Sequence, residues 1–133
     1  MKIAQRVFRI LWVLWAGSLW AMLWVAAIMF HFESDRHVAG RIAASLFSIE
    51  TYLGLALALF ALLSAIRSRF RLGFIAIGLL ACNEWILKAI METARTQGAA
   101  LGLGFGPWHG VSALLYLAAC LCIAALVWQE DFR

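Results

Sequence analysis

Four long apolar runs constrain this chain more than any other feature of its sequence. Each run is long enough for a helix to cross a hydrocarbon core of ~30 Å, which takes about 20 residues. Hydrophobic residues make up 65% of the 133 residues, charged residues only 14%, and the mean hydropathy is +0.91. This composition excludes an ordinary soluble domain. The sequence predicts one all-α transmembrane domain over residues 1–133, an antiparallel four-helix bundle with helices at about 7–31, 35–66, 72–94 and 107–128.

The basic residues predict the orientation of the bundle in the membrane. With four spans, the two termini and the connection between the second and third helices lie on one side. That side carries seven basic residues, and the other side has Arg36, Arg41 and Arg95. The seven are Lys2, Arg6, Arg9, Arg67, Arg69, Arg71 and Arg133. The positive-inside rule therefore predicts that both termini are cytoplasmic. The basic clusters flank apolar runs, so we interpret them as topology signals and expect no nucleic-acid partner.

Several local signals predict how the helices begin and pack. Ser34 is a candidate N-cap for the second helix, and Pro107 suits the first turn of the fourth. Trp12 is expected in an interfacial aromatic belt. Gly54 and Ala58 lie four residues apart, a spacing that permits close helix approach. The glycine-rich segment 95–106 has neither the strand nor the lysine of a phosphate loop, so we expect an external loop.

Ionisable side chains inside the third apolar run are the strongest functional signal. A charge at the centre of a span costs about 2.5 to 3.5 kcal/mol, and each Leu, Ile, Phe or Val contributes roughly 0.3 to 0.6 in its favour. Glu84 and Lys88 therefore need partners, and their four-residue spacing favours an ion pair on one helical face. That pair is either purely structural or part of a site, since ionisable groups in spans are functional candidates.

Topology places most of the interior polar groups in the half of the bundle away from the termini. We expect a polar pocket there, opening to the outer side and formed by Glu50, Asn83, Glu84, Lys88, His109 and Ser112. Ser112 follows His109 by three residues and shares its helical face. Because most such serines bond to the backbone one turn back, nucleophilic catalysis is not supported.

A metal site is the competing interpretation of the same outer half. Copper favours soft thioether and imidazole ligands, which here are Met29, Met91, His31 and His109. Haem between His31 and His109 is disfavoured, because helix ends are shallow and one histidine pair is weak evidence. Cys82, Cys120 and Cys122 all lie in apolar runs and are expected to behave as small hydrophobic residues.

Motifs in all four runs resemble a known family. Residues 14–17 (Leu-Trp-Ala-Gly) and 39–43 (Ala-Gly-Arg-Ile-Ala) are similar to its first two helices, Asn83 matches a polar position in its third, and 105–112 (Phe-Gly-Pro-Trp-His-Gly-Val-Ser) is the most specific match. Together they resemble bacterial four-helix inner-membrane proteins of unknown function related to eukaryotic transmembrane protein 205. A looser similarity is to copper-resistance protein D-like membrane domains.

The resemblance implies a multi-pass protein of the bacterial inner membrane. Its main motif residues here are His109, Gly110 and Ser112, and Asn83 and Gly40 are secondary matches. The family often has proline late in the first helix and after the Asn of the third, where this chain has residues 25–27 (Val-Ala-Ala) and 88–89 (Lys-Ala). The Glu84–Lys88 pair can therefore be particular to this chain.

The functional expectation is a non-enzymatic binding or accessory protein of the membrane, with an unidentified ligand in the outer polar pocket. Its expected partners are the lipid bilayer and either other membrane subunits or further copies of itself. The alternative is a component that handles copper or transports a small solute, in which case copper would be the cofactor.

Overall fold

The predicted four-helix architecture is confirmed by a computed structural model, which describes residues 2–63 and 70–131. Helix α1 is Lys2–Phe32, α2 is Arg36–Leu62 and α5 is Phe105–Asp131. Between α2 and α5, α3 (Arg71–Cys82), a π-helical turn η1 (Asn83–Leu87) and α4 (Lys88–Gln97) follow one another without a break. The predicted continuation of the second helix to residue 66 and the arginines at 67 and 69 lie outside the described residues.

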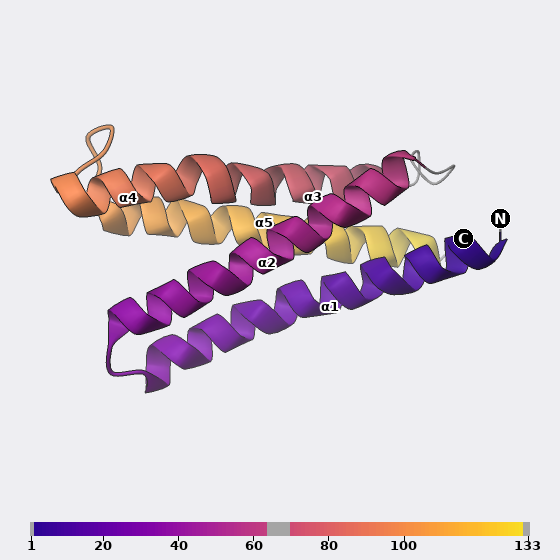
Figure 1. The fold of residues 1–133 in the computed structure, drawn as a ribbon, viewed down its shortest axis with the longest axis horizontal. Coiled ribbons are helices and arrows are strands. Elements are labelled where there is room, and N and C mark those ends of the chain that lie inside the picture. The colour runs from indigo at the N-terminus through magenta and orange to yellow at the C-terminus, as the bar shows by residue number, and fades with distance from the viewer. Residues whose placement is uncertain (1, 64–69, 132–133) are drawn as a thin grey trace.

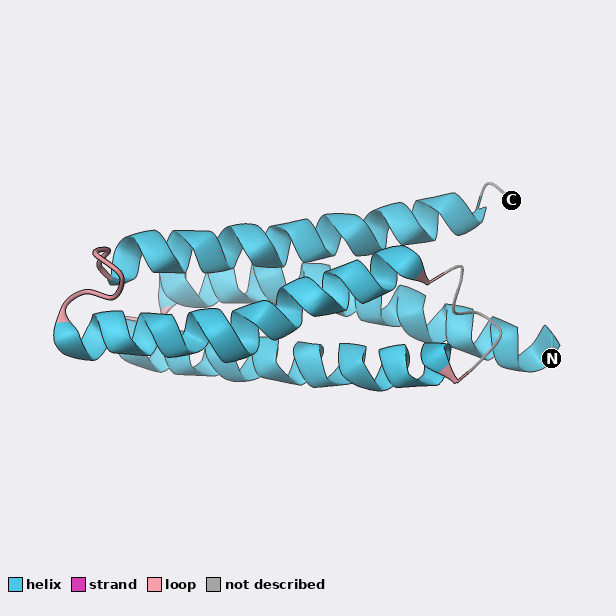
Figure 2. Ribbon diagram, turned by 90° about the horizontal axis from the view of Figure 1, so that it is seen from above, coloured by secondary structure: helices cyan, strands magenta, loops and turns pink. Residues whose placement is uncertain are grey.

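The helices run up and down, so that the start of α1 and the end of α5 lie at the same end of the bundle (Figure 1). Within the described residues, four helices are long and apolar enough to cross a membrane: 3–32, 37–62, 71–97 and 105–129. Around the bundle, α1 packs on α2, α2 on α3, α3 on α5 and α5 on α1, with the α3–α5 interface the most extensive (Figure 2). Each helix thus has two neighbours and one face left for lipid.

Aromatic side chains fill the core at the end where the termini lie. The Trp12 ring stacks on Phe70 with ring centroids 5.0 Å apart, and Phe8 contacts both rings edge-on at 5.1 and 5.4 Å. Phe60 of α2 stacks on Phe8 at 5.2 Å. Trp12 is only 2% exposed, so its expected place in an interfacial belt is wrong. Its position on the inner face of α1 decides this, because Phe70 covers its ring.

The N-cap of α2 is Asp35, one residue after the predicted Ser34. The Asp35 carboxylate accepts hydrogen bonds from the backbone N–H groups of His37 and Val38, at 2.9 and 3.3 Å. Ser34 instead donates to Glu33 at 3.4 Å. Both residue types are good caps, and the carboxylate adds a favourable interaction with the positive end of the helix dipole.

The loop between α4 and α5 is closed by its own hydrogen bonds. Ala100 and Leu103 exchange backbone bonds of 2.8 and 3.0 Å, and the Trp108 indole N–H donates to the Ala100 carbonyl at 2.9 Å. The C-cap of α4 is Gly98 in the left-handed conformation (φ 84°), which glycine adopts without steric cost. Pro107 lies in the first turn of α5, as expected.

Gly54, one of the two small residues expected to permit close helix approach, faces the Trp15 side chain of α1. A Cβ atom at Gly54 would lie 2.5 Å from Cζ2 of Trp15. The Trp15 ring cannot easily move, because it is 4% exposed and its indole N–H donates to the Glu50 carbonyl at 3.1 Å. The Trp15 ring therefore occupies the space that a side chain at position 54 would need.

Gly54→Ala is expected to destabilise the protein by about 1–3 kcal/mol, the usual cost of overpacking a filled interface. The matched control is Gly78→Ala, because Gly78 lies in a span on an exposed face and has no atom within 4 Å of its would-be Cβ. The control should be neutral or slightly stabilising, since alanine is the better helix former. Thermal unfolding in detergent measures both. Equal Tm values for the two variants would contradict the close approach.

Candidate functional site

The site is organised by a π-helical turn in the middle of the third span. In η1 the helix continues through a wider turn, in which the Lys88 N–H reaches the Asn83 carbonyl five residues earlier. Such turns add one residue to a helix and occur frequently at functional sites. Here the turn contains Asn83 and Glu84, and Lys88 follows it directly. The polar residues of this span therefore lie where its helical geometry changes.

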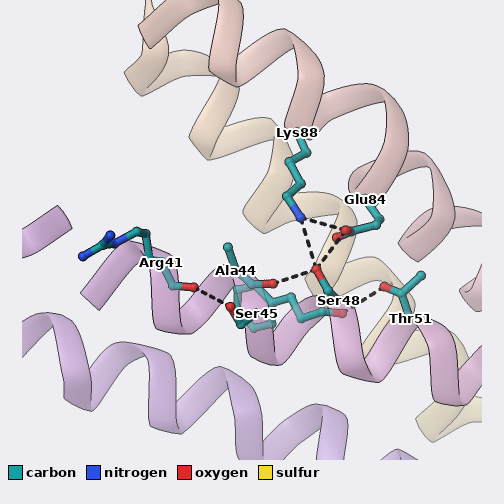
Figure 3. A network of polar contacts seen from close by, with 8 residues as sticks. Arg41, Ala44, Ser45, Ser48, Thr51, Glu84 and Lys88 are labelled. Atoms are coloured by element: carbon teal, nitrogen blue, oxygen red, sulfur yellow. Dashed lines mark hydrogen bonds and ion pairs between the residues drawn. The ribbon is translucent and has the colours of Figure 1, made fainter. Parts of the chain in front are cut away.

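Glu84, Lys88 and Ser48 form a hydrogen-bonded cluster between the π-turn and α2 (Figure 3). The Lys88 ammonium is 2.8 Å from Oε1 of Glu84 and donates to the Ser48 hydroxyl at 3.2 Å. The Ser48 hydroxyl lies 2.8 Å from the same Oε1. The Glu84 side chain is 12% exposed and that of Lys88 49% exposed. The cluster thus neutralises a mostly buried carboxylate and joins α2 to η1.

Asn83 pairs with Ser112 across the interface between η1 and α5. The Ser112 hydroxyl donates to Oδ1 of Asn83 at 2.6 Å, and the Asn83 amide donates to the Ser112 carbonyl at 3.2 Å. One side chain is therefore bonded twice to the neighbouring helix. This pairing fixes which way the Asn83 amide faces and holds the π-turn against α5.

A partly open cleft of about 70 Å³ lies between α2, η1 and α5, beside these two groups. Its polar wall consists of Thr51, Asn83, Glu84, Lys88 and Ser112. Its apolar wall consists of Ala44, Phe47, Leu80, Met91 and Tyr116. A single water needs a cavity of only about 10–15 Å³ by this kind of measure. The cleft therefore has room for several waters or for one small polar group.

Four of the six residues predicted to form the pocket line this cleft: Asn83, Glu84, Lys88 and Ser112. The other two, Glu50 and His109, are not among its lining residues. Glu50 is 2% exposed and faces α1, where the Ser18 hydroxyl donates to its Oε2 at 3.0 Å. His109 is exposed at the start of α5 and stacks on Phe105 at 5.7 Å.

The separation of Glu50 from the cleft follows from helix geometry. Ser48 and Glu50 are two residues apart, which on an α-helix points their side chains about 200° apart. Because Ser48 faces the π-turn, Glu50 must face the other neighbour of α2, which is α1. Sequence reasoning missed Ser48. Its position two residues before Glu50 could have pointed to it, because that spacing places Ser48 on the opposite face of α2 from Glu50.

The four candidate copper ligands have different surroundings. Met91 lines the cleft, and Met29, His31 and His109 do not. His31 packs edge-on against Phe32 at 4.9 Å. In the described part of the chain, no three His, Cys, Asp or Glu side chains form a group that could hold a metal ion. Copper handling stays an untested alternative.

The fold and its apolar helices define the class of this molecule: it is a multi-pass α-helical membrane protein. Within that class the chain belongs to the family defined by a domain of unknown function, DUF4149, whose family model matches residues 10–129. Neither the curated proteins nor the solved structures contain a match to the chain. The expected similarities to transmembrane protein 205 and to copper-resistance protein D-like domains are not seen in these comparisons and stay predictions.

The Asn83–Ser112 pair should contribute measurably to stability. Ser112→Ala removes one interhelical hydrogen bond, and such bonds in membrane proteins are worth about 0.6 kcal/mol on average and up to ~1.7. Asn83→Ala should cost more, because it removes both bonds. In the double variant, the effect of Ser112→Ala should largely disappear. Unfolding in mixed micelles measures this cycle, and strict additivity of the two effects would contradict the pairing.

Ser45→Ala is the matched control for this cycle. The Ser45 hydroxyl donates only to the Arg41 carbonyl one turn back, at 3.0 Å, and the side chain is exposed. Its removal breaks no contact between helices. The free energy of unfolding should therefore stay within about 0.5 kcal/mol of the wild-type value, the usual range for surface substitutions.

Proposed function

We propose that this protein is a non-enzymatic binding or accessory protein of a bacterial inner membrane, and that its cleft holds a small polar ligand. The observation that carries the proposal is the cleft beside the π-turn, with a hydrogen-bonded ion pair on one wall and aromatic side chains on the other. Ligand sites typically combine an apolar lining with a few converging polar groups. Polar groups in a span that served only packing would not need an open cleft beside them.

The cleft has a definite place in the bundle, which supports the proposal. The backbone of α2 closely approaches α3 and η1, and within the described residues it makes no comparable approach to α4 or α5. Helix α2 therefore diverges from α4 and α5 toward the end of the bundle away from the termini, as Figure 1 shows. The side chains of Phe47 and Tyr116 meet below this opening, with ring centroids 4.5 Å apart. They form a floor between the cleft and the rest of the core.

We further propose that the end carrying the termini is cytoplasmic, so that the cleft opens outward. Of the described basic side chains outside the cleft, Arg6, Arg9 and Arg71 lie toward the terminal end, and Arg41 and Arg95 toward the other. Positive residues favour the cytoplasmic side. The exposed apolar side chains of the helices contact lipid. We propose that a second copy or another membrane subunit covers part of that surface, for which Trp24 and Trp85, 68% and 53% exposed, are candidates.

Filling the cleft should remove its ligand. Ala44 lines the cleft, so Ala44→Leu reduces its volume without removing a polar group. Ala56→Leu is the matched control, because Ala56 lies on the exposed face of the same helix. Native mass spectrometry of protein extracted from its own membrane should detect a bound small molecule in the wild type and in Ala56→Leu. Ala44→Leu should retain less than about a tenth of it. A wild-type protein without a ligand, or equal retention in both variants, would reject the proposal.

Fusions should reveal the orientation. Alkaline phosphatase, which is active only after export, should be active when fused at Gly102 in the loop between α4 and α5. It should be inactive when fused after the carboxyl terminus, and green fluorescent protein at the same two positions should show the opposite pattern. The reason is the distribution of arginines described above. Active phosphatase at the carboxyl terminus would place the cleft on the cytoplasmic side.

A further inference from the structure

The hydrogen bonds of the Glu84–Lys88 pair leave part of its bonding capacity unused. Oε1 of Glu84 accepts from both Lys88 and Ser48, whereas Oε2 of Glu84 has no hydrogen-bond donor among the described residues. Lys88 has three N–H donors, and two of them are directed to Glu84 and Ser48. Both side chains line the cleft. The cleft therefore offers a ligand one carboxylate oxygen and one ammonium N–H, close together.

The charge balance of the cleft selects the kind of ligand. Its lining contains one carboxylate, Glu84, and one ammonium, Lys88, so its net charge is zero. Arg41, the nearest other basic residue on α2, extends away from the pair in Figure 3. A simple anion would meet Glu84 and a simple cation would meet Lys88, so each would face a repulsive partner as well as an attractive one. A ligand that carries both signs matches both, because complementary charges give specificity.

The depth of the pair identifies where such a ligand can come from. A rise of about 1.5 Å per residue places Lys88 roughly 25 Å along the helix axis from Arg71. The hydrocarbon core is ~30 Å thick, so with Arg71 at one boundary Lys88 lies a few ångströms inside the other. Long lysine side chains reach from such depths to the interface. The headgroups of the leaflet away from the termini lie at this level.

The cleft has room for the charged part of a headgroup rather than for acyl chains. Its volume of about 70 Å³ suits one small charged group, and its open side leaves the rest of a zwitterionic headgroup at the mouth of the cleft. The apolar wall, which includes Phe47 and Tyr116, suits the short methylene linker between two charged groups. Ser112 and Asn83 are uncharged, and their mutual hydrogen bond of 2.6 Å occupies the Ser112 hydroxyl proton. The tails of a bound lipid would remain in the bilayer beside the open side of the cleft.

We propose that the cleft binds a zwitterion that combines a primary ammonium with a phosphate, as in the headgroup of an ethanolamine phospholipid. The ammonium donates to Oε2 of Glu84, and the phosphate accepts from Lys88. This proposal rests on the proposed function, because it names the ligand class of the same cleft. A free zwitterion such as phosphoethanolamine has the same chemistry, and the experiment distinguishes the two sources.

The test is a comparison of lipids by native mass spectrometry of the full-length protein in detergent. Phosphatidylethanolamine should bind at least about tenfold more tightly than phosphatidylcholine, whose quaternary ammonium has no N–H to donate. It should also bind more tightly than phosphatidylglycerol, which has no cation. This comparison uses only the wild-type protein, so it does not depend on whether a variant folds. Equal affinity for the first two lipids would overturn the proposal.

Variants show whether the pair causes the preference. Glu84→Gln should reduce the preference for phosphatidylethanolamine over phosphatidylcholine to less than about twofold. Lys88→Gln should weaken the binding of both lipids to a similar extent. Glu92→Gln is the matched control: Glu92 forms an exposed pair with Arg95 on α4 at 2.9 Å and does not line the cleft. It should leave the preference unchanged. An unchanged preference in folded Glu84→Gln would overturn the assignment.

Competition with free phosphoethanolamine identifies whether the ligand is a lipid or a solute. The Ala44→Leu variant separates the proposal of a ligand in the cleft from the assignment of that ligand as a zwitterion. If free phosphoethanolamine displaces the lipid, the zwitterion site is supported and a solute is the natural source. If it does not displace the lipid, but phosphatidylethanolamine shows the tenfold preference, the site is supported with lipid as the source. A third outcome separates the two proposals. If the wild-type protein binds ethanolamine and choline lipids with equal affinity, and Ala44→Leu abolishes the binding of both, then the cleft binds a ligand and only the zwitterion assignment fails.

Discussion

The structure depends on one constraint: hydrocarbon offers no hydrogen bonds, so polar side chains inside the spans must find partners on other helices. Two acidic residues meet this constraint at two different interfaces. Glu50 bonds to Ser18 and so joins α2 to α1. Glu84 bonds to Ser48 and Lys88 and so joins the π-turn to α2. Helix α2 is therefore held from both sides by carboxylates, one supplied by itself and one by its neighbour.

The two ends of the bundle are stabilised by different interactions. Near the termini, rings from three parts of the chain pack face to face and edge to face, as Phe8, Phe60 and Phe70 show. Toward the other end the helices diverge, and there the Ser48 hydroxyl bridges α2 to the π-turn. Aromatic rings thus fill one end of the molecule, and toward the other end small buried side chains such as Ala39 and Ala94 pack beside a few directional bonds. The cleft forms where the second kind of interaction replaces the first.

The sequence predicted the helices well and the site only in part, for physical reasons that differ. Run length alone determines that an apolar segment spans the membrane, so the four helices were predictable. The Glu84–Lys88 contact was predictable too, because it is local to one helical face. The side on which Glu50 lies depends on how α2 is rotated in the bundle, which no local pattern specifies. The π-turn has no sequence signature of its own, since no proline or glycine marks residues 83–87.

The extra residue in the π-turn has a consequence for how this site can vary. An α-helix rotates by about 100° per residue, and the wider π-turn takes up one additional residue while α3 and α4 follow one axis. Every side chain of α4 therefore lies about a quarter of a circle from the direction that an uninterrupted α-helix of the same sequence would give it. If Asn83–Leu87 formed a regular α-helix with no residue lost, helix content and membrane insertion would be preserved, yet Lys88 and Met91 would point elsewhere. The cleft is therefore encoded by the conformation of this one turn as much as by the identity of its residues.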